Sequence, residues 1–384
     1  MNIAIASSQI CYFRGGAERA SLRLAHEMRS RGHAVHILTV TGRYSPVYPI
    51  DPRLSVHFFP GIFFHRKLEA IALGPALLQE QRIDVLVSLE SDWKHAMWYA
   101  CSERAQIPFV YSERITPTYV EDNWSRDERL FVLEKAAAIH ELLPCYLKYI
   151  PEHLRSKTFI LPNAVPETVA AQAPERSPKP PILLYLGRLT LQKRPALLLQ
   201  AFGLLAEEFP HWRLRMAGWG AQQEHLESLA HSLGLAERVV IGEAAKDTRL
   251  EYQQASVYCL PTLFEGFPNA VLEAMSAGLP VVGIADCPAM TAIIRHGVTG
   301  LLADSPTPQA LAATLRPLLT SEKARRRMGR EAWRQCQLEY AGKRIFDAWD
   351  ARLCKIVEAF STKKERSSCR NIQETDTCTP PIVT

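Results

Sequence analysis

The feature that most constrains the fold of this chain is a series of short apolar runs, separated by helical or loop stretches, that occurs twice. Helices between successive strands predict parallel, doubly wound sheets, so we expect an α/β protein with two such domains. In the first series the apolar runs lie at residues 2–7, 34–40, 56–59, 85–89, 109–112, 139–142 and 159–161. In the second they lie at residues 182–186, 213–217, 239–241, 257–260 and 280–284.

The boundary between the two series is a change of composition. Residues 166–181 are rich in proline, alanine and charge and lack periodicity, which is typical of an exposed linker. Two Rossmann-like domains joined in this way would form a cleft at the carboxyl ends of their sheets, where open α/β sheets bind ligands. The domains that we expect are a first domain over residues 1–165, a linker over 166–181, a second domain over 182–340, a C-terminal helix over 341–360 and a disordered polar tail over 361–384.

Composition excludes several classes of protein. The chain has 384 residues, 47% of them hydrophobic, which excludes disorder throughout. A net charge of +5 is too small to indicate a dedicated nucleic-acid binder, and nine cysteines without a CxxC pair indicate neither a zinc site nor a disulfide framework. The N-terminus lacks the pattern of a signal peptide, and charges interrupt the most apolar stretch, residues 58–78. We therefore expect a cytoplasmic protein that does not span a membrane.

Two glycine-containing loops follow predicted strands. Gly15 and Gly16 come after the first strand and open a helix, so bare backbone at a helix N-terminus can admit a phosphate there. A tight turn explains these glycines equally well. The pattern is not GxGxxG, and no acidic residue ends the second strand, so a dinucleotide oxidoreductase is disfavoured. Gly218 lies in a second such loop, after the strand at residues 213–217.

Two cations and two carboxylates lie near predicted strand ends in the second domain. Arg188 and Lys193 follow its first strand, and a planar guanidinium with a nearby ammonium suits a diphosphate, although a solvated basic loop would look the same. Glu265 precedes a predicted helix and Glu273 lies one turn inside it, so both can face one ligand if the loop folds back. Amides from residues 266–270, other than Pro268, can then point to an anion. Ordinary surface glutamates remain the alternative.

The run LFEGFPNAVLEAMSAGLPVV resembles the E-x7-E signature of the retaining GT-B glycosyltransferases called family 4, or group 1. The segments GGAER, LPNAV, YLGRLTLQK, MAGWG and HGVTGLL accompany it in that family's order, so the resemblance covers about residues 1–355. It implies two Rossmann-like domains that face each other across a cleft and close on the donor. The first domain would bind the acceptor, the second would bind the nucleotide sugar, and the last helix would return to the first domain.

The resemblance also implies roles for individual residues. Arg188 and Lys193 would clamp the diphosphate and stabilise the leaving phosphate, and Glu265 would bind hydroxyls of the transferred sugar. Glu273 would hold the ribose, and Asn163 would lie at the crossover between the domains. The two cations and the helix amides replace a divalent ion, so no metal and no cofactor besides the nucleotide sugar are expected. The other residues expected to bind the donor are Gly15, Gly16, Gly218, Gly266, Phe267, Pro268, Asn269 and Ala270.

One segment departs from the family pattern. Many relatives carry a histidine where this chain has Ser112-Glu113-Arg114, so we interpret Glu113 and Arg114 as contacts to acceptor or donor, with individual roles undecided. The surrounding YSERITP is most similar to members that extend surface polysaccharides or undecaprenyl-linked glycans. Residues 58–68 combine four phenylalanines with basic side chains, which suits either a membrane interface or a buried strand and helix. Peripheral contact with the inner face of the cytoplasmic membrane therefore stays open.

The function that we expect is retaining transfer of a hexose or N-acetylhexosamine from a nucleotide sugar, most simply a UDP-sugar, to a growing surface glycan or a polyprenyl-lipid-linked acceptor. A front-face displacement, in which the departing phosphate accepts the acceptor proton, fits the absence of an obvious carboxylate nucleophile. Two alternatives remain, a nucleotide-sugar epimerase of the same two-domain shape and a non-catalytic nucleotide-sugar binder.

Overall fold

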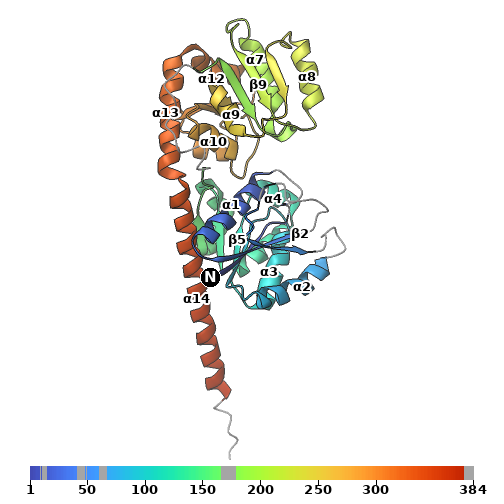
Figure 1. Cartoon of the computed structure of the whole chain (residues 1–384), viewed down its shortest axis with the longest axis vertical. Helices are drawn as coiled ribbons and strands as arrows, with labels where there is room; N and C mark the ends of the chain where they lie inside the picture. Colours follow the sequence, from blue (N-terminus) through green and yellow to red (C-terminus); the bar gives the residue numbers. More distant parts are fainter. Residues whose placement is uncertain are drawn as a thin grey trace, which may run out of the picture. The chain divides into compact units, whose positions relative to one another are not determined.

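The computed structural model describes residues 1–8, 10, 15–40, 48, 50–59, 67–165 and 179–375, without the side chains of residues 40, 67–70 and 367–375. The chain divides into two compact units (Figure 1). Unit 1 consists of Met1–Glu141, Tyr149–Leu161 and Phe346–Thr384, and unit 2 consists of Leu142–Lys148 and Pro162–Ile345.

Unit 1 contains a parallel sheet of seven strands in the order β3-β2-β1-β4-β5-β6-β7. The expected α/β class is confirmed for this unit. Strands β4 and β5 are buried along their whole length, which is why their sequences are continuous apolar runs rather than alternating ones. The elements of unit 1 are β1 (Asn2–Ala6), α1 (Gly16–Ser30), β2 (Ala34–Val40), β3 (Ser55–Phe59), α2 (Lys67–Glu80), β4 (Val85–Ser88), α3 (Lys94–Ala105), β5 (Phe109–Ser112), α4 (Pro117–Asn123), α5 (Arg126–Lys135), β6 (Ala138–Glu141), the 3-10 helix η2 (Glu152–Lys157), β7 (Thr158–Ile160) and most of α14 (Gly342–Thr375).

Unit 2 contains a parallel sheet of six strands in the order β10-β9-β8-β11-β12-β13. The order reverses between β8 and β11, as it does between β1 and β4 in unit 1, so both sheets have a switch point at which neighbouring loops diverge. Besides the first residues of α14, the elements that begin in unit 2 are the 3-10 helix η1 (Pro144–Tyr149), β8 (Ile182–Leu186), the 3-10 helix η3 (Leu191–Lys193), α7 (Pro195–Leu205), β9 (Arg213–Ala217), α8 (Gln223–Ser232), β10 (Val239–Gly242), α9 (Thr248–Gln254), β11 (Val257–Cys259), α10 (Asn269–Ser276), β12 (Val281–Ile284), α11 (Pro288–Ile293), β13 (Gly300–Ala303), α12 (Pro308–Thr320) and α13 (Glu322–Glu339).

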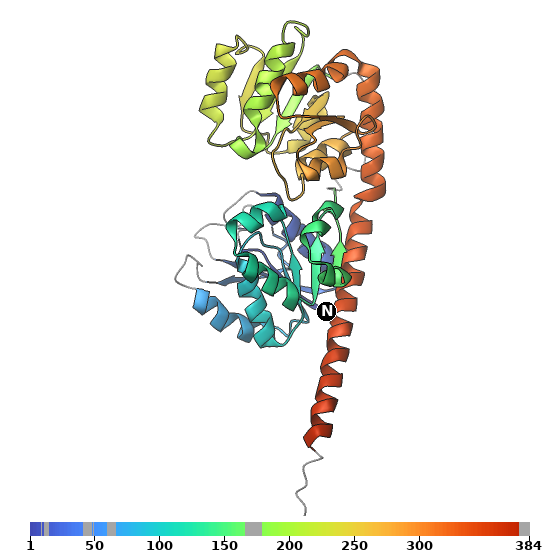
Figure 2. The same ribbon diagram turned by 180° about the vertical axis from the view of Figure 1, so that it is seen from behind.

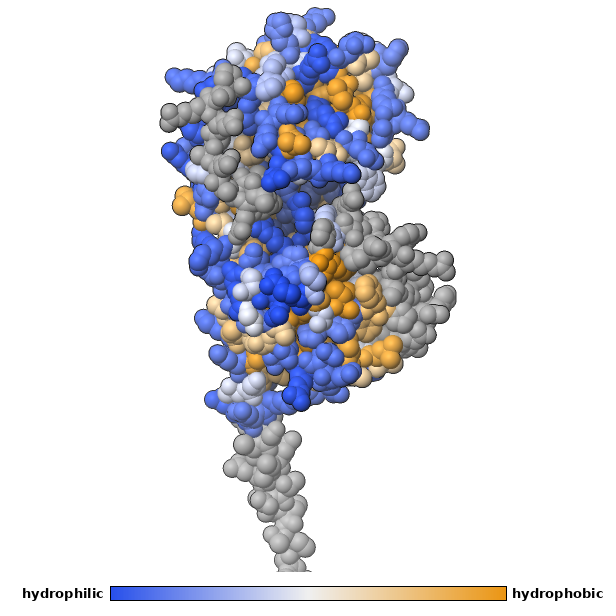
Figure 3. Space-filling model, viewed as in Figure 1, coloured by the Kyte–Doolittle hydropathy of each residue, from blue (hydrophilic) through white to orange (hydrophobic). Residues whose placement is uncertain are grey.

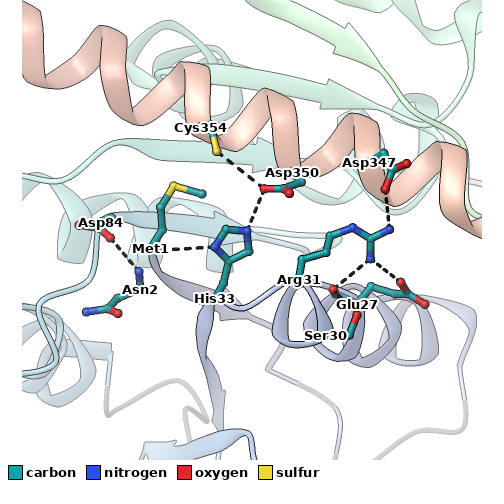
Figure 4. Close-up of polar contacts among 10 residues, drawn as sticks. All are labelled: Met1, Asn2, Glu27, Ser30, Arg31, His33, Asp84, Asp347, Asp350 and Cys354. Atoms are coloured by element: carbon teal, nitrogen blue, oxygen red, sulfur yellow. Dashed lines mark hydrogen bonds and ion pairs between the residues drawn. The ribbon is translucent and has the colours of Figure 1, made fainter.

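The last helix, α14, begins in unit 2 and belongs to unit 1 from Phe346, and its last turns extend beyond the body of that unit (Figure 2). Arg31 Nη2 donates a hydrogen bond to Asp347 Oδ1 at 2.9 Å, and His33 Nε2 lies 2.8 Å from Asp350 Oδ1 (Figure 4). On the same helix Trp349 is buried, with its ring centroid 4.5 Å from that of His140. Apolar packing and two polar contacts therefore hold α14 on unit 1.

The expectation of a disordered tail from residue 361 is wrong as far as Thr375, because α14 continues to that residue. Residues 361–375 contain neither proline nor glycine, and a helix that is already nucleated gains one hydrogen bond for each added residue. A polar run without periodicity can therefore extend a helix that an upstream apolar face has anchored. Residues 376–384 lie outside the described residues.

The boundary between the units also differs from the expected one. Residues 142–148 and 162–165 belong to unit 2, although we expected the first domain to extend to residue 165. The amide of Val165 donates to Tyr340 O at 2.9 Å, and the hydroxyl of Tyr146 donates to Glu265 O, so hydrogen bonds hold both segments in unit 2. Most of the expected linker, residues 166–178, lies outside the described residues.

The described residues contain no helix that is both long and apolar enough to cross a membrane. They also contain no cluster of three or more His, Cys, Asp or Glu side chains that could hold a metal ion. Of the aromatic and basic segment at residues 58–68, Phe58 is half exposed and Phe59 is buried. Residues 60–66, on which the rest of that prediction falls, lie outside the described residues.

Candidate functional site

The switch point of unit 2 brings together two loops that the sequence places 72 positions apart. One follows β8 and contains η3, and the other follows β11. Gln192 joins them, because its side-chain Nε2 donates to Phe264 O at 2.8 Å and its main-chain oxygen accepts from the amide of Leu263 at 2.8 Å. The two motifs expected to bind a nucleotide sugar are therefore neighbours in space.

Lys193 and Glu265 form an ion pair at this place. Both side chains are largely removed from solvent, with 13% and 9% of their surfaces exposed. The main-chain oxygen of Glu265 accepts a hydrogen bond from the hydroxyl of Tyr146, which is buried. Glu265 is thus held at its backbone and at its carboxylate, and an anionic ligand near Lys193 would compete with that carboxylate for the ammonium group.

Arg188 lies on the β8 loop with an exposed side chain. Its Nη2 donates to Gln192 Oε1 at 3.1 Å, and its main-chain oxygen accepts from the hydroxyl of Tyr185 at 2.6 Å. Burial raises the pKa of Tyr185, so the hydroxyl stays protonated and continues to donate. The backbone of Arg188 is therefore fixed, while most of its guanidinium is available to a ligand.

Helix α10 begins at the next part of the β11 loop. The amides of Gly266, Phe267 and Ala270 donate no hydrogen bond to a residue in the described part of the chain. The amide of Asn269 donates to Phe267 O at 2.9 Å, so this amide is not directed outward as we expected. Three of the expected four amides thus remain for an anion or a sugar oxygen.

Two further predicted residues are anchored around α10. Glu273 is buried inside the helix, and its Oε2 accepts from the hydroxyl of Tyr252 at 3.1 Å, so an α9 residue orients this carboxylate. Asn163 Nδ2 donates to Asn269 Oδ1 at 2.9 Å. Asn163 therefore contacts the first residue of α10 within unit 2.

Gly218, after β9, packs directly on the backbone of the β8 loop. A Cβ atom at this position would lie 1.9 Å from Gly187 O, which is far inside van der Waals contact. The amide of Gly187 also donates to Ala217 O at 3.0 Å. The loops after β8 and β9 therefore fit together only if residue 218 has no side chain.

The predicted residues of unit 1 lie at the carboxyl edge of its own sheet. Gly15 caps α1 and Gly16 is its first residue, and Glu18 in the same turn is buried. A Cβ on Gly15 would lie 2.1 Å from Glu18 Oε2, so a carboxylate lies against the helix N-terminus where we expected a phosphate. Arg114 is also buried, which lowers its pKa to about 10 despite the attraction of Glu18.

Glu113 is directed into the protein rather than toward solvent. It is 1% exposed, and its carboxylate accepts from Arg129 Nε at 3.1 Å, from Arg129 Nη2 at 2.8 Å and from the Tyr111 hydroxyl at 2.8 Å. Burial, followed by repulsion from Glu113, raises the pKa of the adjacent Glu141. Glu113 therefore anchors the loop that carries Arg114, and the expectation that Glu113 itself contacts a substrate is not supported by its position.

The sequence did not single out several residues that build these sites. Gln192 lies inside a quoted motif, but its link to the β11 loop depends on the strand order, which spacing does not reveal. Tyr146, Tyr252 and Arg129 each act on a predicted residue through a contact between elements far apart in the chain. A buried tyrosine or arginine has no local signature that distinguishes it from a core residue.

Residues 14–139 match the family described as Glycosyltransferase Family 4, and residues 168–335 match the family described as Glycosyl transferases group 1. The chain belongs to the family 4, or group 1, glycosyltransferases. An uncharacterized glycosyltransferase of Haemophilus influenzae is 22% identical to it over 351 residues, which are 87% of this chain and 95% of that relative.

Solved structures of glycosyltransferases share the fold. HepE from Anabaena in complex with UDP-glucose has a TM-score of 0.73 and 16% identity, covering 94% of this glycosyltransferase and 100% of HepE. The lipopolysaccharide outer core galactosyltransferase WaaB in its apo form has a TM-score of 0.68 and 16% identity, covering 92% and 99% of the two chains. These likenesses establish the GT-B fold, as the sequence predicted.

Proposed function

We propose that this glycosyltransferase moves a hexose or N-acetylhexosamine from a UDP-sugar to a growing surface glycan or to a lipid-linked glycan, with retention of configuration at the transferred carbon. The observation that carries the proposal is the Lys193–Glu265 ion pair beside Arg188 and the amides of α10. This arrangement offers two cations to a diphosphate and a carboxylate to sugar hydroxyls at one sheet edge.

The chemistry follows from the charges. When the bond between the anomeric carbon and the diphosphate breaks, negative charge develops on the leaving oxygen, and Arg188 with Lys193 would stabilise it. The acceptor hydroxyl forms the new bond to the anomeric carbon on the same face, and its proton goes to the departing phosphate. Cationic side chains and α10 amides take the part that a divalent ion plays in other transferases, so the proposal includes no metal ion and no cofactor.

The donor assignment is supported by relatives that bind such a molecule. HepE was solved with UDP-glucose, and this chain has the same fold. Glu273, which Tyr252 orients, would hold the ribose hydroxyls. Gly218 would let the nucleotide approach the backbone, and Gly15 with Gly16 would admit phosphates once Glu18 turns away. Asn163 would orient the start of α10 through Asn269.

The acceptor assignment is supported by WaaB, which acts on the lipopolysaccharide outer core, and by apolar surface on unit 1 (Figure 3). Phe58, Leu73 and Phe131 on this unit are each about half exposed. Exposed aromatic and aliphatic side chains favour contact with a lipid-linked acceptor at a membrane surface. We therefore place the reaction at the inner face of the cytoplasmic membrane, with Arg114 as a contact to acceptor or donor.

The first experiment is incubation of the purified protein with UDP-, GDP-, ADP- and dTDP-sugars and a bacterial membrane lipid extract. We expect release of UDP together with labelled sugar in the lipid fraction, and loss of both in Arg188→Ala, Lys193→Ala and Glu273→Ala. An epimerised donor without acceptor would indicate the epimerase alternative, and UDP binding without release or transfer would indicate a non-catalytic binder. Either result would overturn the proposal.

A further inference from the structure

The switch point of the sheet in unit 1 carries a carboxyl group to which the sequence assigned no role. Strands β1 and β4 are neighbours there and pair in parallel from Ile3 with Val85 to Ala6 with Ser88. Just beyond their carboxyl ends lie Ser8 and Glu90. Open α/β sheets bind ligands at this position, because the loops from the two strands run to opposite sides.

Glu90 is held rigidly through one of its two oxygens. Its Oε1 accepts from the amide of Ser8 at 2.9 Å, from the hydroxyl of Ser8, and from Trp98 Nε1 at 3.1 Å. Ser8 is 2% exposed and Trp98 is fully buried in the core of unit 1. Three donors from two residues, Ser8 after β1 and Trp98 on α3, thus fix the carboxyl group before any ligand arrives.

The second oxygen of Glu90 has a different environment. Oε2 accepts no hydrogen bond from a described residue. It is also not one of the fully buried atoms without a partner, so it keeps some contact with solvent. A carboxyl group with a purely structural role would be expected to use both oxygens, because a buried oxygen without a donor is costly. One fixed oxygen and one available oxygen are instead typical of a group that orients a ligand.

The charge of the site indicates what kind of ligand it accepts. A carboxyl group repels phosphate, so the diphosphate of a donor does not belong at Glu90, and the cations suited to it lie in unit 2 at Arg188 and Lys193. Among the described residues, the charged side chains that act on Glu90 are Lys94 and Asp92, which pair with each other. Burial raises the pKa of Glu90 to about 7, so near neutral pH Oε2 can either accept from or donate to a hydroxyl group.

We propose that Glu90 binds a hydroxyl group of the glycosyl acceptor, a sugar or polyol, through Oε2, while Ser8 and Trp98 hold Oε1. This assignment rests on the proposed function and adds a residue that selects the acceptor. It also predicts that a change at Glu90 weakens acceptor binding and leaves nucleotide binding unchanged.

The test uses Glu90→Gln, Ser8→Ala and the exposed Glu152→Gln as a matched control. The donors at Ser8 and Trp98 force the amide oxygen of glutamine toward them, so its NH2 group replaces Oε2 at the ligand position. The measurements are UDP affinity by calorimetry and the rate of sugar transfer from the donor identified in the panel, as a function of the concentration of membrane lipid extract. Thermal unfolding of each variant verifies its fold.

We expect Glu90→Gln to raise the half-saturating extract concentration about tenfold while the UDP affinity stays within twofold of wild type. Ser8→Ala should shift the same constant in the same direction but less, and Glu152→Gln should not shift it. Wild-type kinetics in both Glu90→Gln and Ser8→Ala, or an equal loss of UDP affinity, would overturn the assignment. Absence of transfer by the wild-type protein would instead overturn the proposed function, so the two failures are distinguishable.

Discussion

Lys193 and Glu265 lie 72 positions apart in the chain and form an ion pair between the loops after β8 and β11. Both side chains are largely buried, so each charge needs the other to compensate for its removal from water. A diphosphate that approaches Lys193 would take over part of this role and release the Glu265 carboxylate toward the sugar hydroxyls. Under the proposed function, the pair would link donor binding to the orientation of the transferred sugar.

Replacing Lys193 should reduce transfer strongly. We expect Lys193→Ala to lower the turnover rate at least ~100-fold, the usual effect of removing one group that stabilises charge developing in a transition state. The measurement is UDP release at saturating donor. Arg249→Ala is the matched control, since Arg249 forms an exposed ion pair with Asp247 elsewhere in unit 2. A Lys193→Ala enzyme with more than half of the wild-type rate would contradict the assignment.

Gly218 provides a test of backbone fit that is independent of charge. Gly218 and Gly242 have nearly the same φ, 157° and 156°, but a Cβ at 218 would meet Gly187 O at 1.9 Å, whereas nothing lies within 4 Å at 242. Gly218→Ala should lower the free energy of unfolding by about 2 kcal/mol and weaken UDP binding, because the β8 loop must shift. Gly242→Ala is the control, because it imposes the same backbone strain without the contact to a neighbouring loop. Equal effects of the two changes, by urea unfolding and calorimetry, would refute the close-approach explanation.

The Glu113–Arg129 pair predicts a large effect on stability from one side chain. Both groups are almost fully buried, so Arg129→Met would leave an uncompensated carboxylate and should cost about 3 kcal/mol or more of unfolding free energy. The double variant Glu113→Gln/Arg129→Met removes both charges and should recover most of this loss. If the double variant is no more stable than Arg129→Met in urea unfolding, the pair does not act as a unit.

The sequence predicted every strand that the structure describes, except β13 (Gly300–Ala303), to within one residue at each end. Four strands, Ala34–Val40, Phe109–Ser112, Ile182–Leu186 and Arg213–Ala217, have the expected bounds. Phe109–Ser112 is buried along its whole length, as expected of a strand covered on both faces, whereas Arg213–Ala217 alternates polar and apolar residues. The end of α14 was not predictable in this way. The sequence of its last turns has no apolar periodicity. These turns form because they extend a helix that Trp349 already anchors on unit 1.

The candidate site was predicted as a set of residues but not as a set of contacts. Spacing placed Lys193 and Glu265 at strand ends, yet their pairing depends on β8 lying beside β11, which local sequence does not encode. Spacing also left the direction of a side chain undetermined, as the adjacent Glu113 and Arg114 illustrate. In the structure, Glu113 forms an ion pair with Arg129, a residue 16 positions away on α5.

Packing rather than polar contacts should dominate the attachment of α14 to unit 1. Asp347 keeps 49% and Asp350 keeps 31% of its side-chain surface exposed, so Asp347→Asn and Asp350→Asn should each change the unfolding free energy by less than about 1 kcal/mol. Trp349 is 4% exposed and contacts the rings of His140 and Phe159, so Trp349→Ala should cost about 3 kcal/mol or more. Denaturant unfolding of the three variants gives the comparison, and a reversed order would show that the ion pairs carry the attachment.

Glu90 should make the stability of the protein depend on pH. Burial raises its pKa from 4.5 to about 7, and Lys94 lowers it only in part while Asp92 raises it. Between these two values the folded state keeps a proton that the unfolded state has lost, so stability falls as pH rises through this window. Above pH 7 the loss is complete and on the order of 3 kcal/mol. Below pH 4.5 both states are protonated, and the penalty disappears.

Glu90→Gln removes this titration while its amide oxygen can still accept from Ser8 and Trp98. The variant should therefore be more stable than wild type at pH 8 and about equal to it at pH 4.5, when urea unfolding is measured at both values. Glu152→Gln, which changes an exposed carboxylate, should follow the wild-type curve at both. A difference between Glu90→Gln and wild type that is the same at both pH values would mean that folding does not raise the pKa of Glu90.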